Sequence, residues 1–128
     1  MAVARPRALV VEDDPEIRKL LRKYLDKLGL DVSEAGTGKA ALAMLDGEEQ
    51  YSLVCLDLML PESSGYTICE HIRGAPRLRE LPVLVISARS MPPDRALAEE
   101  VGANAYLIKP IRWVSFAATV HQLLGMTD

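Results

Sequence analysis

Five short apolar runs alternate regularly with five longer amphipathic segments along this chain, and this pattern leaves few possible folds. The apolar runs are rich in valine, leucine and isoleucine, and they lie at Ala8–Val11, Leu30–Val32, Ser52–Leu56, Val83–Ile86 and Ala105–Ile108. Runs of this length and composition, with little polar alternation, are typical of strands that are covered on both faces. The chain is therefore predicted to alternate between strand and helix throughout.

The segments between the apolar runs carry helix signals. The first has Asp14 where an N-cap is expected, Pro15 at the first helical position and Gly29 just after the last apolar residue. The second helix is predicted from about Thr37 to Leu45, and the third starts near Ser64 and ends before Gly74. The fourth follows Pro92 and Pro93 with Gly102 after it, and the fifth follows Pro110 with Val114, Ala117, Val120 and Leu124 on one side. Alternating strands and helices form parallel sheets through right-handed crossovers. The sequence thus predicts one α/β domain over residues 1–128, with a doubly wound five-stranded parallel sheet and helices on both faces.

Composition and charge exclude several classes of protein. With 49% hydrophobic and 26% charged residues, the chain has the composition of an ordinary globular domain. Its formal net charge of −3 provides no general attraction to nucleic acid, so no direct nucleic-acid binding is expected. No apolar stretch has the length of a secretory signal or a membrane span. Cys55 and Cys69 are too far apart for a CxxC site, and we expect buried free thiols in a cytoplasmic protein.

Polar residues follow four of the five predicted strands. The carboxyl ends of parallel strands are where ligands bind in open sheets, and these ends carry Glu12, Asp13, Asp14, Asp57, Ser87 and Lys109. Carboxylates gathered in a partly desolvated pocket repel one another, and a hard divalent cation such as Mg²⁺ relieves that repulsion. A carboxylate can also accept a phosphoryl group when nearby positive charge neutralises the phosphoryl oxygens. The pattern therefore predicts a magnesium-assisted phosphoryl-transfer site.

Four stretches of the sequence, in this order, resemble the receiver domains of two-component response regulators over essentially the whole chain. They are Leu9–Asp14, Leu56–Pro61 with Gly65, Pro82–Ala88 and Gly102–Pro110. The resemblance implies the flavodoxin-like strand order 2-1-3-4-5 of chemotaxis-type, CheY-like receivers. It also implies a signalling switch, not an enzyme, because such a domain catalyses only its own phosphorylation and slow dephosphorylation.

The same resemblance assigns roles to individual residues. Asp57 matches the phosphoacceptor, and Mg²⁺, which Mn²⁺ could replace, is the implied cofactor. The implied metal ligands are Asp13, Asp57, the backbone carbonyl of Met59 and, through water, Glu12. Met59 also occupies a position that tunes the lifetime of the phosphoryl group, and its apolar side chain predicts slow self-dephosphorylation.

Three further residues match the switch and phosphate-binding positions of the family. Ser87 matches the switch hydroxyl, Lys109 the phosphate-binding lysine, and Tyr106 the aromatic residue whose rotamer follows activation. The resemblance implies that the surface of the fourth helix, fifth strand and fifth helix changes on phosphorylation and binds a downstream effector. The phosphoryl group would come from a histidine kinase or a histidine phosphotransfer protein.

The resemblance also bears on assembly. We expect no membrane contact, and a monomer or a weak phosphorylation-dependent dimer. The last predicted helix has only Arg112 near its start and lacks the basic pattern of DNA-binding regulators that dimerise through this face. This favours a stand-alone regulator over a fragment of a longer one.

Other interpretations stay open at this point. A haloacid-dehalogenase-like phosphatase uses similar groups but needs a second Asp where Met59 stands, and a degenerate receiver would act as a phosphorylation-independent interaction module. Gly36, Gly38 and Ala41 fit a short dinucleotide pattern, which flexible turn glycines also explain. The first helix carries a basic stripe that predicts a solvated face, with kinase docking as the rarer alternative: Arg18, Lys19, Arg22, Lys23 and Lys27.

Overall fold

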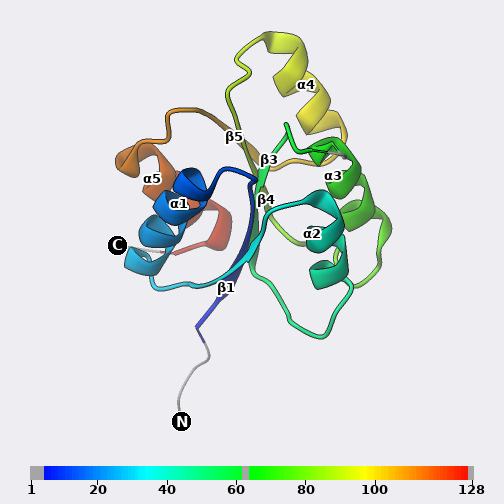
Figure 1. The fold of residues 1–128 in the computed structure, drawn as a ribbon, viewed down its shortest axis with the longest axis horizontal. Helices are drawn as coiled ribbons and strands as arrows, with labels where there is room; N and C mark the ends of the chain where they lie inside the picture. The colour runs from blue at the N-terminus through cyan, green and yellow to red at the C-terminus, as the bar shows by residue number, and fades with distance from the viewer. Residues whose placement is uncertain (1–4, 62–63, 127–128) are drawn as a thin grey trace.

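Strands and helices alternate along the chain, as the sequence predicts. The computed structural model describes residues 5–61 and 64–126, and within them five strands alternate with five helices (Figure 1). The elements are β1 (Arg7–Val11), α1 (Pro15–Lys27), β2 (Asp31–Ala35), α2 (Gly38–Leu45), β3 (Leu53–Asp57), α3 (Gly65–Gly74), β4 (Val83–Ser87), α4 (Pro92–Glu100), β5 (Ala105–Ile108) and α5 (Trp113–Leu124). No helix in this part of the chain has the length and apolar character needed to cross a bilayer.

The five strands form one parallel sheet in the order β2-β1-β3-β4-β5, which confirms the order implied by the resemblance. The register pairs Val11 of β1 with Leu56 of β3, and Asp57 of β3 with Ile86 of β4. Ser87, at the end of β4, pairs with Ile108 at the end of β5. Four strand ends therefore lie side by side at one edge of the sheet, which is where the polar residues of the sequence follow them.

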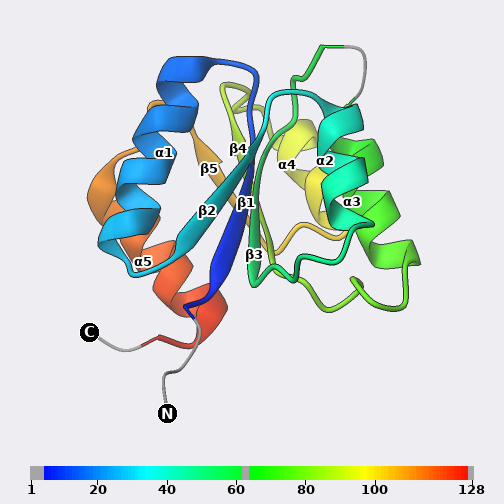
Figure 2. The same cartoon turned by 60° about the horizontal axis from the view of Figure 1, so that its bottom comes forward.

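Helices cover both faces of the sheet, with α1 and α5 on one side and α2, α3 and α4 on the other (Figure 2). Every residue of β3 and β4 is buried, and alternate strand residues belong to the two cores on either side. Leu56 and Val85 pack with the α2–α3 side, whereas Cys55 and Ile86 pack with the α1–α5 side. Burial on both faces explains why the central strands read as unbroken apolar runs.

The two edge strands differ from the prediction that every strand is covered on both faces. All of β5 and most of β2 are only partly buried or exposed, because an edge strand has a neighbour on one side alone. β2 also runs from Asp31 to Ala35, beyond the predicted Leu30–Val32. Its added residues include Glu34, whose carboxylate pairs with Arg18 and Arg22, so a polar side chain replaces apolar burial at this edge.

The helix starts follow the sequence signals closely. Asp14 accepts a hydrogen bond from the amide of Glu16, and Thr37 accepts one from the amide of Ala40. The predicted apolar side of α5 is wrong for one residue, because Val114 is 77% exposed. Phe116 takes the buried position instead, and its ring lies 5.5 Å from that of Tyr24 on α1.

Candidate functional site

Three carboxylates meet at the carboxyl edge of the sheet. Glu12 and Asp13 follow β1, Asp57 ends β3, and one oxygen of each lies within 4.8 Å of the others. Glu12 and Asp57 are buried, whereas Asp13 is exposed. Because Val11 and Leu56 are paired neighbours in the sheet, the residues that follow them are brought together by the register.

Lys109 joins the two buried acids. Its Nζ donates to Oε1 of Glu12 at 2.8 Å and to Oδ2 of Asp57 at 3.0 Å, and its side chain is 19% exposed. The backbone amide of Lys109 donates to the carbonyl of Ser87 at 2.8 Å, which fixes the lysine beside the end of β4. One ammonium group therefore links the ends of β1, β3 and β5.

Backbone donors hold the remaining oxygens of the two buried acids. Oε2 of Glu12 accepts from the amide of Asp14 at 3.1 Å, and Oδ1 of Asp57 accepts from the amide of Met59 at 3.0 Å. The chain after Asp57 is also crowded, since a Cβ on Gly65 would lie 2.7 Å from the Asp57 carbonyl oxygen. Only glycine allows α3 to begin this close to the strand end.

The electrostatics of the pocket follow from this arrangement. Burial raises the pKa of Glu12 above its ordinary value, and the hydrogen bond from Lys109 opposes that shift only in part. For Lys109, burial works to lower the pKa, but the hydrogen bonds to Glu12 and Asp57 outweigh it and the pKa is raised. The lysine is therefore firmly cationic, and the pocket favours added positive charge.

The donor set fits a hard divalent cation. Three carboxylates face one ammonium group, which leaves a formal excess of two negative charges, the charge that one Mg²⁺ carries. All the side-chain donors are oxygens, and exposed Asp13 leaves the cluster open to solvent on one side, which suits an ion that keeps part of its water shell.

The two predicted switch side chains, Ser87 and Tyr106, form hydrogen bonds with the backbone of the same residue, Arg89. The Oγ of Ser87, which is completely buried, accepts from the amide of Arg89 at 3.1 Å. The hydroxyl of Tyr106 donates to the carbonyl of Arg89 at 2.9 Å. The backbone of Arg89 thus connects the end of β4 with the ring carried by β5.

The family comparison settles the class of protein. The family model for the response regulator receiver domain matches residues 8–121, which include every strand end described above. The chain belongs to this family. Receiver domains are generally signalling modules, so membership of this family does not support the phosphatase and dinucleotide interpretations.

Curated relatives of this receiver domain are regulators of transcription. It is 37% identical over 123 residues to the DNA-binding dual master transcriptional regulator RpaA of Synechocystis sp., covering 96% of this chain and 51% of RpaA. It is 39% identical over 116 residues to the transcriptional regulatory protein GltR of Pseudomonas aeruginosa, covering 91% of this chain and 48% of GltR. The chain thus spans about half the length of these relatives.

Solved structures agree with the family assignment. A putative response regulator from Chloroflexus aurantiacus superposes with a TM-score of 0.90 at 29% identity, covering 95% of this chain and 99% of that one. The response regulator DrrB, a Thermotoga maritima OmpR/PhoB homologue, superposes with a TM-score of 0.84 at 32% identity, covering 95% of this chain and 54% of DrrB.

Sequence reasoning missed two arginines of this receiver domain. Arg89 donates from Nε to Sδ of Met59 at 3.0 Å and from Nη1 to Asp94 at 3.3 Å, so its side chain lies beside the segment that follows Asp57. The basic stripe of α1 predicts a solvated side chain for Arg18, yet its guanidinium contacts the backbone carbonyls of Glu12 and Asp13. The one available signal was its place four residues after Asp14, on the first turn of the helix that follows the acids.

Proposed function

We propose that this receiver domain is the phosphoacceptor switch of a two-component system, and that Asp57 takes a phosphoryl group from a phosphohistidine. The donor would be a histidine kinase or a histidine phosphotransfer protein, which also implies a cytoplasmic location. The observation that carries the proposal is the buried Asp57 carboxylate, held 3.0 Å from Lys109 and within 4.8 Å of two further acids.

The geometry supports a simple transfer. A carboxylate oxygen of Asp57 forms the new bond to phosphorus while the phosphorus–nitrogen bond of phosphohistidine breaks, and the imidazole leaves with a proton from solvent. Lys109 neutralises one phosphoryl oxygen. Mg²⁺ supplies further positive charge to the phosphoryl oxygens when bound. Its proposed ligands are Asp13, Asp57, the Met59 carbonyl and, through water, Glu12.

Loss of the phosphoryl group is proposed to be slow. Met59 is 52% exposed, and its sulfur accepts from Arg89, so the side chain beside the acceptor offers no group that could orient an attacking water. Replacing Met59 with Asn should shorten the lifetime of phosphorylated Asp57. An unchanged lifetime would contradict this part of the proposal.

The switch is proposed to act through Arg89. Phosphorylation adds roughly −1.5 to −2 charges at Asp57, which draws the Ser87 hydroxyl toward the new oxygens. The Arg89 amide then loses its present acceptor, and the loop whose carbonyl holds Tyr106 rearranges with it. A shift from 1:99 to 99:1 needs about 5.5 kcal/mol. One charge-assisted hydrogen bond contributes roughly 1.5–3 kcal/mol, so several contacts must act together.

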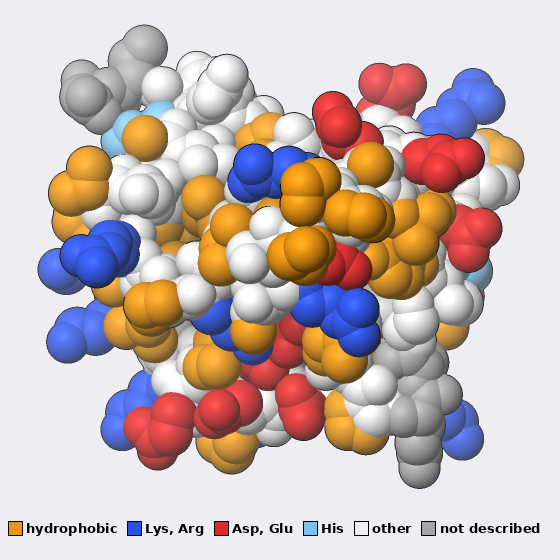
Figure 3. Space-filling view, turned by 90° about the horizontal axis from the view of Figure 1, so that it is seen from above, with side chains coloured by type: hydrophobic (Ala, Val, Ile, Leu, Met, Phe, Trp, Pro, Cys, Tyr) orange, Lys and Arg blue, Asp and Glu red, His pale blue; other side chains and the backbone are white. Residues whose placement is uncertain are grey.

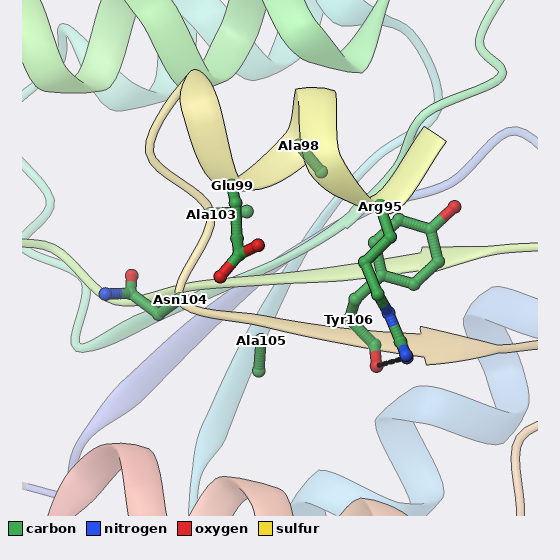
Figure 4. A pocket seen from close by; sticks show the side chains of 7 residues that line it. All are labelled: Arg95, Ala98, Glu99, Ala103, Asn104, Ala105 and Tyr106. Atoms are coloured by element: carbon green, nitrogen blue, oxygen red, sulfur yellow. Dashed lines mark hydrogen bonds between the residues drawn. The ribbon is translucent and has the colours of Figure 1, made fainter. Parts of the chain in front are cut away.

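The proposed effector surface is formed by α4, β5 and α5. Hydrophobic side chains are open to solvent among charged ones on the side where α4 lies (Figure 3), and those on the three elements or beside them are Met91, Leu97, Ile108 and Val114. A pocket between α4 and β5 is lined in part by Arg95, Glu99 and Tyr106, and the Arg95 guanidinium lies over the Tyr106 ring (Figure 4). Movement of Tyr106 would therefore change this pocket directly.

The proposal treats residues 1–128 as one receiver unit that acts as a monomer or a weak phosphorylation-dependent dimer, either alone or joined to an output domain. RpaA is described as DNA-binding, and GltR as a transcriptional regulatory protein. Any DNA binding by a longer form of this protein would belong to the output domain, because the net charge of −3 does not favour nucleic acid here.

The decisive experiment is incubation of the purified chain with acetyl phosphate and Mg²⁺, followed by mass spectrometry of the intact protein. The wild-type chain should gain one phosphoryl group, and Asp57→Asn should gain none. Asp46→Asn, which removes an exposed acid on the α2 side, is the matched control and should be phosphorylated normally. If the folded wild-type chain forms no adduct, the domain is a phosphorylation-independent interaction module.

A further inference from the structure

Asp13 is the one acid of the pocket whose carboxylate has no hydrogen-bond or ion-pair partner among the described residues. Glu12 and Asp57 each accept from Lys109 and from a backbone amide. The Asp13 carboxylate accepts no hydrogen bond and forms no ion pair within residues 5–61 and 64–126. The backbone torsions of residue 13 set the direction of its Cα–Cβ bond, and so the region that the carboxylate can reach.

Arg18 donates hydrogen bonds to the backbone on both sides of the Asp13 Cα. Its Nη1 donates to the carbonyl of Glu12 at 2.8 Å and to the carbonyl of Asp13 at 3.2 Å. These carbonyls belong to the two peptide groups that flank the Asp13 Cα. Since each peptide group is planar, only the two torsions at that Cα can turn one group relative to the other. A single nitrogen bonded to both carbonyls therefore restrains both torsions.

The arginine is itself held in place. Its Nε donates to Oε1 of Glu34 at 3.2 Å, and Oε2 of the same carboxylate accepts from Arg22 at 2.6 Å. A Cβ on Gly36 would lie only 3.2 Å from the Arg18 Nη1, so the turn after β2 packs closely against the guanidinium. A planar fork can bind Glu34 and the two carbonyls at once, which the single ammonium group of lysine cannot do with the same geometry.

We propose that Arg18 is a positioning residue for the cation site: it presets the backbone of Asp13 so that the carboxylate faces Glu12 and Asp57 before a cation arrives. This inference rests on the proposed Mg²⁺ site. For the change in cation affinity when Arg18 is replaced, this inference predicts the opposite direction from simple electrostatics. Removing a positive charge near three acids should strengthen cation binding, whereas removing a positioning residue should weaken it.

The test measures Mg²⁺ affinity by isothermal titration calorimetry in four proteins: wild type, Arg18→Gln, Arg18→Lys and Arg22→Gln. We expect both Arg18 variants to bind Mg²⁺ about tenfold more weakly or worse, the range seen when a partner that orients a ligand is lost. Arg22→Gln removes the same charge and the same Glu34 partner but no contact to the Glu12 or Asp13 carbonyls. Its affinity should change by less than about twofold, because this exposed charge is screened by solvent and salt.

A second measurement needs no metal. Amide hydrogen exchange in the cation-free proteins should be faster at residues 13 and 14 in Arg18→Gln than in Arg22→Gln, because the restraint on that loop is lost. Arg18→Lys keeps the positive charge, so the same exchange measurement can be made on it if Arg18→Gln does not fold.

The outcomes separate this inference from the proposed function. Tighter binding in Arg18→Gln with unchanged binding in Arg18→Lys would show that charge alone acts, and would overturn the positioning role. Equal affinities in all four proteins would overturn it as well. A folded wild-type chain with no affinity for Mg²⁺ would refute both the proposed cation site and the role of Arg18 in it.

Discussion

At the carboxyl edge of β1 and β3, Glu12 is 1% exposed, Asp57 is 4% exposed, and both are bonded to Lys109. On the α4–β5 face the structure is much more open: Ala98 is the one buried residue of α4, and no residue of β5 is fully buried. The two regions are joined through Ser87, Arg89 and Tyr106. Charged side chains are thus buried and hydrogen-bonded to one another where the proposed chemistry occurs, whereas the face proposed to respond to phosphorylation contains few buried side chains.

The largest expected difference between the two regions is in packing energy. Leu56→Ala, in the core of β3 beside the pocket, should lower the free energy of unfolding by about 2–5 kcal/mol. Leu97→Ala, on exposed α4, should change it by less than about 0.5 kcal/mol. Urea denaturation of both variants measures this. Equal losses would mean that α4 contributes to stability as the central strands do, and the comparison would fail.

Removal of the pocket lysine should have the next largest effect. Lys109→Met leaves two buried carboxylates without their shared cation, and we expect a loss of about 2 kcal/mol, below the roughly 3–5 kcal/mol of a fully buried pair. Arg95→Met, which removes the cation over the Tyr106 ring on the open face, should lose only about 0.5–1 kcal/mol. Thermal unfolding at low salt gives both values. A Lys109 variant as stable as wild type would contradict the account of the pocket.

A smaller effect is expected from Mg²⁺ itself. At a free concentration tenfold above its dissociation constant, Mg²⁺ should stabilise the folded chain by about 1.4 kcal/mol. Asp13→Asn should abolish this gain, whereas Glu99→Gln, which changes an acid of the α4–β5 pocket, should retain it. Denaturation with and without Mg²⁺ tests the assignment, and a gain that survives Asp13→Asn would place the cation elsewhere.

The smallest signal should come from the two buried thiols, Cys55 and Cys69. Burial raises the pKa of Cys55 to about 12 and that of Cys69 to about 11. Because the thiolate is the reactive form, a raised pKa leaves both thiols protonated at pH 8, and iodoacetamide should alkylate the native protein hardly at all. Leu97→Cys places a thiol at an exposed position on α4 and should be alkylated readily. Rapid modification of Cys55 in the folded chain would show that β3 opens to solvent.

Much of this structure could be predicted from local sequence. The apolar runs of β1, β3, β4 and β5 locate those strands to within a residue or two, because central strands are buried on both faces and β5 keeps an apolar composition. β2 was predicted too short because Ser33 and Glu34 are polar residues of an edge strand. Val114 was assigned to the wrong side because helical spacing alone does not say which apolar side chains face the core.

In the candidate site, too, some residues could be predicted from the sequence and others could not. Glu12, Asp13, Asp57, Ser87 and Lys109 could be named from the sequence because each stands next to a strand end, and the ends of parallel strands share one edge. Their functional roles come from the family resemblance and remain predictions. Arg18 and Arg89 were missed, because their partners are backbone carbonyls and a thioether, and such contacts leave little or no pattern in the residue types of the sequence.

Local sequence specified the number of elements and their succession along the chain, the edge at which polar residues gather and the caps that begin α1 and α2, because these depend on residues near one another in the chain. The folded arrangement was needed to show that Lys109 forms hydrogen bonds with both buried acids across 97 and 52 residues of sequence. It alone also showed that Arg18 holds the backbone around Asp13. Hydrogen bonds of this kind depend on distances and directions between segments, which are set when the sheet and its helices come together.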